Sequence, residues 1–396
     1  MKNIAAELAW GLGRIGKAFG NLLSAGVRLC CPVVKGRVMC WSYNFKQYSC
    51  NPRYLTEYLL ENDPDFEIYW VFRKSINTRD LDPRIRQVRF RSWRYFLLVN
   101  TAQFLVTNAR TDPYKIYWRK RPGQRYLMLW HGGVALKKIE QDAEGVLSLS
   151  YLKKARLDSK VCDLMISGCR FQTELVKNRF WYGGEVLQEG IPRNDIFFKS
   201  QLHVPMREKV GRQYGIAQQE KLVLYAPTFR TDHSLEPYRI DWQRVIPELE
   251  RFFDGSPVTV LLRMHPLLIG KADVSSLINH PKVMDVTRYH DMQELLCISD
   301  LLITDYSSSM FDYSMTLKPC LLYAVDRHAY DRGFYFDMKK LPYPLAETEE
   351  ELISVIRSFD FSQYRSSLAN FFDREVGLME AGHACASLSE WMRSHD

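Results

Sequence analysis

The stretch that decides the fold class is Leu301-Leu302-Ile303-Thr304-Asp305-Tyr306-Ser307-Ser308-Ser309. It opens with three apolar residues and a threonine, which is typical of a short strand buried on both faces of a parallel sheet. Polar residues and then an apolar helical pattern follow directly. The same alternation of strand and helix recurs along the chain, and it predicts an α/β protein with parallel sheets.

Two series of such strands are predicted. The first comprises Arg37–Ser42, Glu67–Val71, Phe104–Thr107, Tyr126–Trp130 and Leu164–Ile166. The second comprises Lys221–Ala226, Val258–Arg263, Val283–Asp285, Leu301–Thr304 and Cys320–Tyr323. A polar stretch, Gln201–Gln219, separates them. We therefore predict two α/β domains with a ligand site in the cleft between them, because open parallel sheets bind ligands beyond the carboxyl ends of their strands.

The predicted boundaries are 1–35 for a basic N-terminal segment, 36–200 and 201–345 for the two α/β domains, and 346–396 for a helical tail. The 396 residues carry 54 Lys+Arg and 46 Asp+Glu, giving a net charge of +8, and 46% of them are hydrophobic. This composition excludes a disordered chain. We expect no transmembrane helix, because no run of about 18 uncharged apolar residues occurs.

Cysteine usage and the N-terminus bear on the cellular compartment. The nine cysteines include no CxxC pair, so we expect no zinc ribbon and reduced thiols in a cytosolic protein. The N-terminus lacks an apolar stretch with a small-residue cleavage site, so we expect no secretory signal.

The first 40 residues have a net charge of +5. Their cations are Lys2, Arg14, Lys17, Arg28, Lys35 and Arg37, against Glu7. Apolar residues at helical spacing are Ile4, Leu8, Leu12, Ile15, Phe19 and Leu22. This pattern predicts a basic amphipathic helix on an anionic membrane surface. The alternative is a helix packed against the protein's own core or against a partner.

A second basic stretch, Arg110–Glu140, has a net charge of +6. Nucleic acid is one partner for such a stretch. However, no helix-turn-helix, RNP or zinc-finger pattern accompanies it, so we expect no nucleic acid and favour a phosphate-bearing substrate or a lipid headgroup.

A histidine follows the apolar strand Tyr126–Trp130. His131 is succeeded by Gly132 and Gly133, and Lys137 comes shortly after them. A neutral imidazole at a strand's carboxyl end could take a proton from an attacking hydroxyl, and glycines let a substrate approach the backbone. The alternative is an ordinary core or surface histidine beside a glycine turn.

Two strands of the second series end in cations or hydrogen-bond donors suited to phosphate. Thr228 and Arg230 follow Lys221–Ala226, and Arg263 and His265 end the next strand before Pro266. A guanidinium and a hydroxyl suit phosphate oxygens, and a histidine can donate to a diphosphate or protonate a leaving phosphate. The alternatives are a solvated arginine in a turn and a structural histidine.

The stretch that opened this section ends in serines. Ser307 and Ser308 precede a helix, where hydroxyls and free N–H groups suit phosphate, while an ordinary helix cap is the alternative. Glu294 either accepts from ribose hydroxyls or is solvated, and Gly190–Asp195 forms a turn at the hinge between the domains.

These motifs together resemble the CDP-glycerol glycerophosphotransferase family, the teichoic-acid primases and polymerases of bacterial cell envelopes. The likeness runs from about Cys40 to Asp337. It is carried by Trp130-His131-Gly132, Gly190-Ile191-Pro192-Arg193-Asn194-Asp195, Ala226-Pro227-Thr228-Phe229-Arg230, Met264-His265-Pro266, Thr304-Asp305-Tyr306-Ser307-Ser308 and Gly333-Phe334-Tyr335-Phe336-Asp337. One departure is Gly133-Val134-Ala135, where many relatives have Thr-Pro directly after the Trp-His-Gly motif.

The resemblance implies a GT-B fold, in which two Rossmann-like domains face each other across a cleft. Residues 36–200 would bind the acceptor and 201–345 the nucleotide donor. It implies transfer of glycerol phosphate or ribitol phosphate from a CDP-linked donor to a hydroxyl of a lipid-linked saccharide, with release of CMP, in teichoic-acid or capsule synthesis at the cytoplasmic face of the membrane.

The resemblance implies that His131 is the base and that His265, Arg230, Ser307 and Ser308 hold the phosphates of the donor. We therefore predict two catalytic residues, His131 and His265. From their positions we add Thr228, Arg263 and Glu294 to the donor-binding residues, and Gly132, Gly133 and Lys137 to the acceptor side. We expect no cofactor and no tightly bound metal, with at most a loose Mg²⁺. The alternatives are a glycosyltransferase that uses a nucleotide sugar and a non-catalytic binder of anionic envelope polymers.

Overall fold

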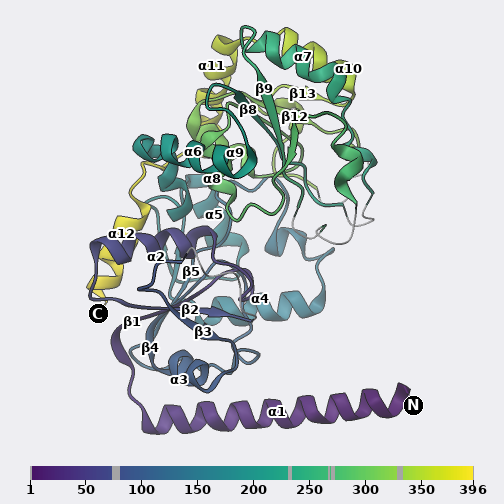
Figure 1. The fold of residues 1–396 in the computed structure, drawn as a ribbon. Helices are drawn as coiled ribbons and strands as arrows, with labels where there is room; N and C mark the ends of the chain where they lie inside the picture. Colours follow the sequence, from purple (N-terminus) through teal and green to yellow (C-terminus); the bar gives the residue numbers. More distant parts are fainter. Residues whose placement is uncertain are drawn as a thin grey trace.

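The computed structural model describes residues 2–73, 81–230, 234–265, 268, 273–327 and 333–395, with side chains from residue 16 onward. Within this part the chain forms two lobes, each built on a parallel β-sheet flanked by helices (Figure 1). We call them the N-lobe, whose strands lie between Val34 and Leu187, and the C-lobe, whose strands lie between Lys221 and Ala346. The predicted α/β class with two parallel sheets is confirmed.

Six strands of each sheet follow the same order. The N-lobe strands are β1 (Val34–Trp41), β2 (Glu67–Phe72), β3 (Arg86–Arg89), β4 (Ala102–Thr107), β5 (Arg125–Met128), β6 (Leu164–Ile166) and β7 (Glu185–Leu187), in the order β3-β2-β1-β4-β5-β6-β7. The C-lobe strands are β8 (Lys221–Tyr225), β9 (Val258–Leu262), β10 (Val283–Asp285), β11 (Leu301–Thr304), β12 (Cys320–Tyr323) and β13 (Leu345–Ala346), in the order β10-β9-β8-β11-β12-β13. Each sheet thus contains the 3-2-1-4-5-6 order of the Rossmann fold, with its direction reversing at β1/β4 and at β8/β11.

All ten predicted strands are confirmed, and four of them match residue for residue: β6, β10, β11 and β12. The strands that the sequence did not reveal are β3, β7 and β13, each of which is an edge strand. Val88 is the one buried residue of β3, because an edge strand covers less of the core and can carry polar residues.

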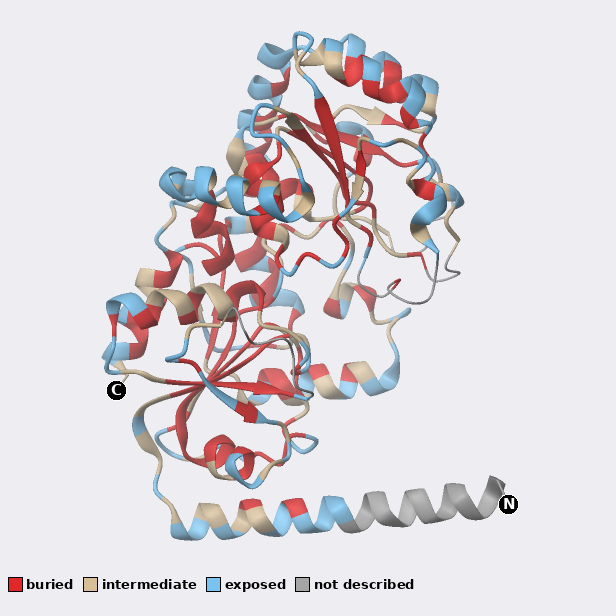
Figure 2. Cartoon of the chain, viewed as in Figure 1, coloured by how far each residue is buried: buried red, intermediate tan, exposed pale blue. Residues whose placement is uncertain are grey.

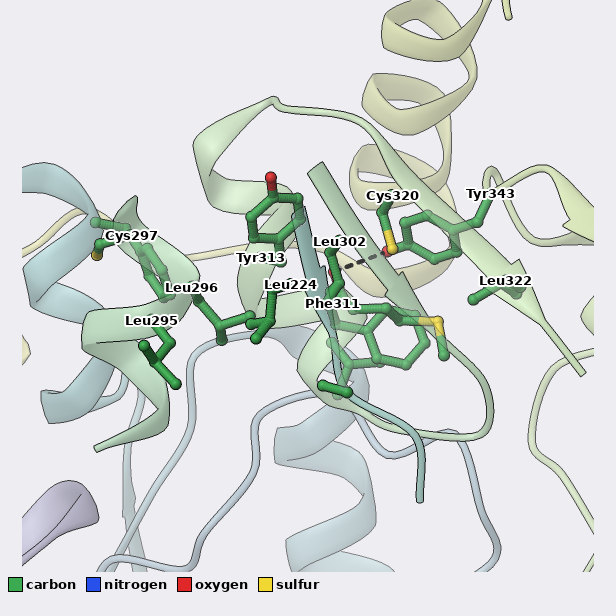
Figure 3. Packing of buried hydrophobic residues seen from close by; sticks show 14 of the residues in the cluster. Leu224, Leu295, Leu296, Cys297, Leu302, Phe311, Tyr313, Cys320, Leu322 and Tyr343 are labelled. Carbon is green, nitrogen blue, oxygen red and sulfur yellow. Dashed lines mark hydrogen bonds between the residues drawn. The ribbon is translucent and has the colours of Figure 1, made fainter. Parts of the chain in front are cut away.

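The C-lobe core shows why continuous apolar runs form these central strands. Leu302 and Leu322 belong to one apolar cluster with residues of the helices α8 (Met292–Ile298) and α9 (Ser309–Tyr313), part of which Figure 3 shows. The alternate residues Ile303 and Leu321 join a second cluster on the opposite face of the sheet. Successive side chains therefore enter two apolar layers, and the strands are buried throughout (Figure 2).

The helices cover both sheets. In the N-lobe they are α2 (Cys50–Asn62), α3 (Trp93–Thr101), α4 (Leu149–Val161) and α5 (Arg170–Arg179), and α6 (His203–Tyr214), α7 (Trp242–Phe252), α10 (Glu349–Arg357) and α11 (Phe361–Phe371) follow later in the chain. The last helix, α12 (Ala384–Ser394), returns to the N-lobe and packs against α2, whereas α10 packs against α7 (Figure 1). The region predicted as a tail is thus divided between the two lobes.

The N-terminal helix α1 (Lys2–Cys30) packs against α3 and extends beyond the N-lobe (Figure 1). Phe19, Leu22 and Leu29 on it are 61%, 71% and 86% exposed. The sequence also places Ile4, Leu8, Leu12 and Ile15 on the apolar face of this helix, but these side chains lie outside the part that the structure describes. Among the described residues, no helix combines the length and the apolarity needed to cross a membrane.

Candidate active site

A cleft of about 740 Å³ lies between the lobes, beyond the carboxyl ends of β5, β8, β9 and β11. Nine of the predicted site residues line it. From the N-lobe these are His131, Gly132, Gly133 and Lys137; from the C-lobe they are Thr228, Arg230, His265, Ser307 and Ser308. The two imidazoles that the sequence singled out, which follow strands of different sheets, therefore open onto the same cavity.

The loop that presents His131 leaves the sheet in a sharp turn. After β5 ends, Trp130 adopts a φ of 49°, a left-handed conformation that costs a non-glycine residue on the order of 1–3 kcal/mol. Asn51 of α2 stabilises the turn, since its Nδ2 donates to the carbonyl oxygens of Leu129 at 2.7 Å and of Trp130 at 3.0 Å. The turn directs the next residue, His131, away from the sheet and into the cleft.

The next two carbonyls of this loop are also held by side chains. Arg193 donates from Nη1 to the carbonyl of His131 at 2.7 Å, and Gln172 of α5 donates from Nε2 to the carbonyl of Gly132 at 3.0 Å. Four consecutive carbonyls, from residue 129 to residue 132, thus accept hydrogen bonds from three buried side chains on three different elements. Such support holds a reactive side chain in one orientation.

His131 is neutral and carries its proton on Nδ1, which is the form that a general base requires. Its Nδ1 lies 3.0 Å from the carbonyl oxygen of Asn108. A carbonyl only accepts, so Nδ1 carries the proton and Nε2 keeps its lone pair. Desolvation by the surrounding protein, and then the positive charges of Arg193 and Arg110, lower the pKa of His131 to about 4. The imidazole is therefore neutral at pH 7 although the side chain is accessible from the cleft.

The two glycines after His131 have different neighbours. A Cβ on Gly132 would lie 3.8 Å from the hydroxyl of Ser308, so the N-lobe backbone comes close to the C-lobe serine loop there. A Cβ on Gly133 would lie 3.1 Å from Cδ1 of Ile191, which is a tight contact. Gly133 therefore makes room for the packing of Ile191, whereas the space at Gly132 would admit a Cβ at ordinary van der Waals distance.

Arg230 lines the cleft, but its donors are engaged within the protein. Nε and Nη2 bind Asp326 at 2.6 and 2.9 Å, Nη2 also binds Asp305 at 2.8 Å, and Nη1 donates to the carbonyl and hydroxyl oxygens of Thr228. These bonds use all five N–H groups of the guanidinium. Its face lies 4.9 Å from the ring of Tyr306. In this arrangement Arg230 orders the loops after β8 and β11 and offers no remaining N–H to a phosphate.

His265 lies at the end of β9, on the C-lobe side of the cleft. Its ring centroid is 5.6 Å from that of Phe229. Burial, followed by the charges of Lys137 and Arg263, lowers the pKa of His265. Lys137, from the N-lobe, lines the same cleft as this C-lobe histidine. Pro266, which completes the predicted motif, lies outside the described residues.

Ser307 and Ser308 line the cleft as half-buried residues. The hydroxyl of Ser307 lies 2.8 Å from that of Ser309, whereas Ser308, at the N-cap of α9, makes no side-chain capping bond. Helix α9 has only five residues, so the two hydroxyls themselves are the polar groups that this loop offers to a ligand.

Two predicted donor residues lie outside the cleft lining. Arg263 donates to the carbonyl of Tyr289 at 2.8 Å. Glu294 is buried between the lobes, where Arg53 of α2 donates to it at 2.8 Å and Lys209 lies 3.2 Å away. Although burial opposes it, hydrogen bonds and charges from its partners, including His290 and Arg53, hold the pKa of Glu294 well below its usual range. Glu294 is thus an anchor between the lobes.

The basic stretch Arg110–Glu140 is not one continuous surface. Arg110 is 2% exposed and binds Glu140 at 2.8 Å and Asp158 at 3.0 Å. Lys120 pairs with Asp163 at 2.6 Å. Part of the positive charge that the sequence suggested for a partner is therefore neutralised inside the N-lobe.

Fold and site together define an α/β protein with two Rossmann-ordered sheets and a cleft equipped with a neutral histidine from each lobe. The chain belongs to the family described as CDP-Glycerol:Poly(glycerophosphate) glycerophosphotransferase, whose model matches residues 24–384. The resemblance seen in the sequence motifs is thereby confirmed.

Curated relatives agree with this assignment. The chain is 31% identical over 374 residues to the teichoic acid poly(glycerol phosphate) polymerase of Bacillus subtilis (strain 168), covering 91% of this chain and 49% of that protein. It is 33% identical over 357 residues to the teichoic acid glycerol-phosphate transferase of Staphylococcus aureus (strain NCTC 8325 / PS 47), covering 87% and 89%. The chain thus spans about half the length of the first relative and most of the second.

Solved structures share the whole fold. The wall teichoic acid polymerase TagF, in a histidine-to-alanine variant, superposes with a TM-score of 0.81 at 27% identity and covers 100% of this chain and 98% of that chain. A histidine-to-asparagine variant of the same polymerase, with CDPG, superposes equally well, with a TM-score of 0.81.

Proposed function

We propose that this chain transfers glycerol phosphate, or a related polyol phosphate, from a CDP-linked donor to a hydroxyl of a lipid-linked saccharide in teichoic-acid or capsule synthesis. The observation that carries the proposal is that His131 and His265, from opposite lobes, line one cleft together with Ser307 and Ser308. Membership of the family supports the donor class. The matching strand orders support a GT-B arrangement with the acceptor in 36–200 and the nucleotide in 201–345.

The reaction follows from the roles of the two histidines. Nε2 of His131 takes the proton of the acceptor hydroxyl, and the oxygen attacks the phosphorus that bears the glycerol. The bond between this phosphorus and the bridging oxygen breaks, and CMP leaves with the electron pair. His265, Ser307 and Ser308 hydrogen-bond the phosphate oxygens, where charge develops.

The low pKa of His131 fits this order of events. An imidazole with a pKa of about 4 is available in its neutral form before the substrate arrives. The negative charge of a diphosphate then raises that pKa, because an opposite charge stabilises the imidazolium. The base therefore becomes stronger once the donor is bound.

The N-terminal helix supports a peripheral position at the cytoplasmic face of an anionic membrane. Phe19, Leu22 and Leu29 of α1 are exposed, and Lys17 and Arg28 lie on the same helix. Apolar side chains among cations are typical of helices that lie at a lipid surface. Such a position would bring the cleft to a lipid-linked acceptor. Residues 1–35 would then be the membrane-associating segment, as the sequence predicts.

The test is to incubate the protein with CDP-glycerol or CDP-ribitol and a panel of lipid-linked saccharides, and to measure products by mass. We expect CMP and an acceptor heavier by one or more polyol phosphates. Release of a nucleoside diphosphate from a nucleotide sugar would instead identify a glycosyltransferase. Tight CDP-glycerol binding without turnover in the presence of acceptor would identify a binding protein.

A further inference from the structure

Arg193 connects the two sides of the cleft. It belongs to the short helix η2 (Pro192–Phe198), in the turn that the sequence placed at the hinge, and is 8% exposed. Nη1 donates to the carbonyl of His131 at 2.7 Å, and Nη2 donates to Oδ2 of Asp312. Its own backbone N–H donates to Asn51, which supports the same loop. One guanidinium is thus bonded to the N-lobe loop that presents the base and to a C-lobe carboxylate.

Asp312 extends this connection to the phosphate side of the site. It lies on α9, directly after Ser307 and Ser308. Gln293 also donates to its Oδ2 at 3.0 Å, so the carboxylate is fixed from two directions. The bonds therefore run from the backbone of His131 through Arg193 to the helix that begins at the serine loop.

We propose that Arg193 is a positioning residue, which sets the distance and orientation of His131 relative to the serine loop across the cleft. The proposal rests on the proposed function, because it assigns opposite ends of one reaction to these two groups. A guanidinium has a rigid, planar fork of donors, so it can hold two acceptors in fixed relative positions. A misplacement of about 1 Å at a reacting group can cost about 10²-fold in rate.

The chain provides a matched control in Arg53. This arginine is also largely buried and also joins the lobes, through Asp291 at 3.0 Å and Glu294 at 2.8 Å. Its ion pairs do not include the loop of His131 or Asp312. Arg53→Gln therefore removes an interlobe arginine of the same kind and leaves the supports of His131 in place.

The experiment compares R193Q, R193K and R53Q with the unaltered full-length protein. For R193Q we expect kcat to fall by about 10²-fold, the size expected for a misplaced base, with the Kd for CDP-glycerol unchanged within about threefold. R193K, which restores the charge but not the fork, should recover part of kcat. R53Q should keep kcat within about fivefold, because it leaves the supports of His131 in place. Equal losses in R193Q and R53Q, or parallel losses of kcat and donor affinity in R193Q, would overturn the proposal.

A second readout does not depend on turnover. Arg193 and Arg110 are the charged groups acting on His131, and the ring of Tyr43 lies 6.1 Å from its ring. Removing the charge of Arg193 should raise the pKa of His131 in an NMR titration, with its signal assigned by comparison with H131N, whereas R53Q should leave it unchanged. An unaltered pKa in R193Q would contradict the proposal. If the wild type turned over no CDP-linked donor, the proposed function would fail, while the titration would still test whether Arg193 acts on His131.

Discussion

The two sides of the cleft use their polar residues differently. On the N-lobe side, amide and guanidinium donors bind four backbone carbonyls, and the imidazole of His131 remains available to a substrate. On the C-lobe side, the guanidinium of Arg230 is engaged by two carboxylates and a threonine. The comparison teaches that a charged residue after a strand is not by itself a ligand for substrate. Its availability depends on the partners that the fold brings to it.

The sharpest test of this contrast is His131→Ala. If His131 is the base, kcat should fall at least about 10²-fold, which is the lower limit of typical general-base effects. The Kd for CDP-glycerol should change little, because the groups assigned to the donor lie on the other lobe. Steady-state kinetics and calorimetry of donor binding measure the two quantities. A matching loss of donor affinity would place His131 on the phosphates instead.

The counterpart on the C-lobe side is Arg230→Met. This change leaves the carboxylates of Asp305 and Asp326 without their guanidinium, and breaking a buried ion pair in this way costs about 3 kcal/mol. We expect the free energy of unfolding in urea to fall by that amount. The double variant R230M/D326N should recover part of the loss. A stable R230M protein with a greatly weakened donor Kd would show that Arg230 acts as a phosphate ligand.

The carboxylates of the two lobes provide a third comparison. Asp326 has a lowered pKa, since its bonds to Arg230 and Tyr306 outweigh the effect of burial. Glu380, before α12, accepts from the N–H of Ile191 at 3.1 Å and from Asn194 at 3.0 Å, and burial raises its pKa to about 8. The folded protein therefore keeps a proton on Glu380 that the unfolded chain releases near its ordinary pKa.

Stability should consequently fall as the pH rises from about 4.5 to about 8, because the folded state binds more protons in this window. Glu380→Gln should remove this dependence and unfold at a higher temperature than the wild type at pH 8. Asn194→Ser, which removes one partner of the carboxylate but leaves it ionisable, is a suitable control that should retain the dependence. Identical melting curves for wild type and E380Q from pH 5 to pH 8 would contradict the raised pKa.

The smallest expected effect is a rise in stability with pH, which is opposite in sign to the effect of Glu380. Because the pKa of His131 is lowered from 6.5 to about 4, the unfolded chain binds a proton there that the folded chain does not. The contribution of His131 to stability is therefore complete above pH 6.5 and is lost as the pH falls toward 4. His131→Asn should flatten the acid side of the stability profile, measured by urea unfolding at closely spaced pH values.

Local sequence was sufficient for the central strands and for the positions of the two histidines. Strands such as β11 and β12 are buried throughout and almost wholly apolar, and the loops that follow their carboxyl ends face the cleft. The edge strand β3, Arg-Gln-Val-Arg, has one apolar residue and therefore left no such signal. Asn51 and Gln172 also escaped notice, because a single polar residue in a helix does not reveal which carbonyl it will meet.

The roles of Arg230 and Glu294 depend on residues distant in the sequence. Asp326 is 96 residues from Arg230, and Arg53 is 241 residues from Glu294. Spacing within a motif contains no information about such partners. The sequence could thus indicate which strand ends form the site, whereas the division between structural and substrate-facing side chains required the packed lobes.

The return of α12 to the N-lobe means that the polypeptide crosses between the lobes twice, first between β7 and β8 and again after α11. The two crossings together define one axis between the lobes. Opening and closing about the line through them is compatible with both connections, whereas a swivel of one lobe on the other would stretch one of them. A protease cut at a single crossing would consequently leave the halves attached.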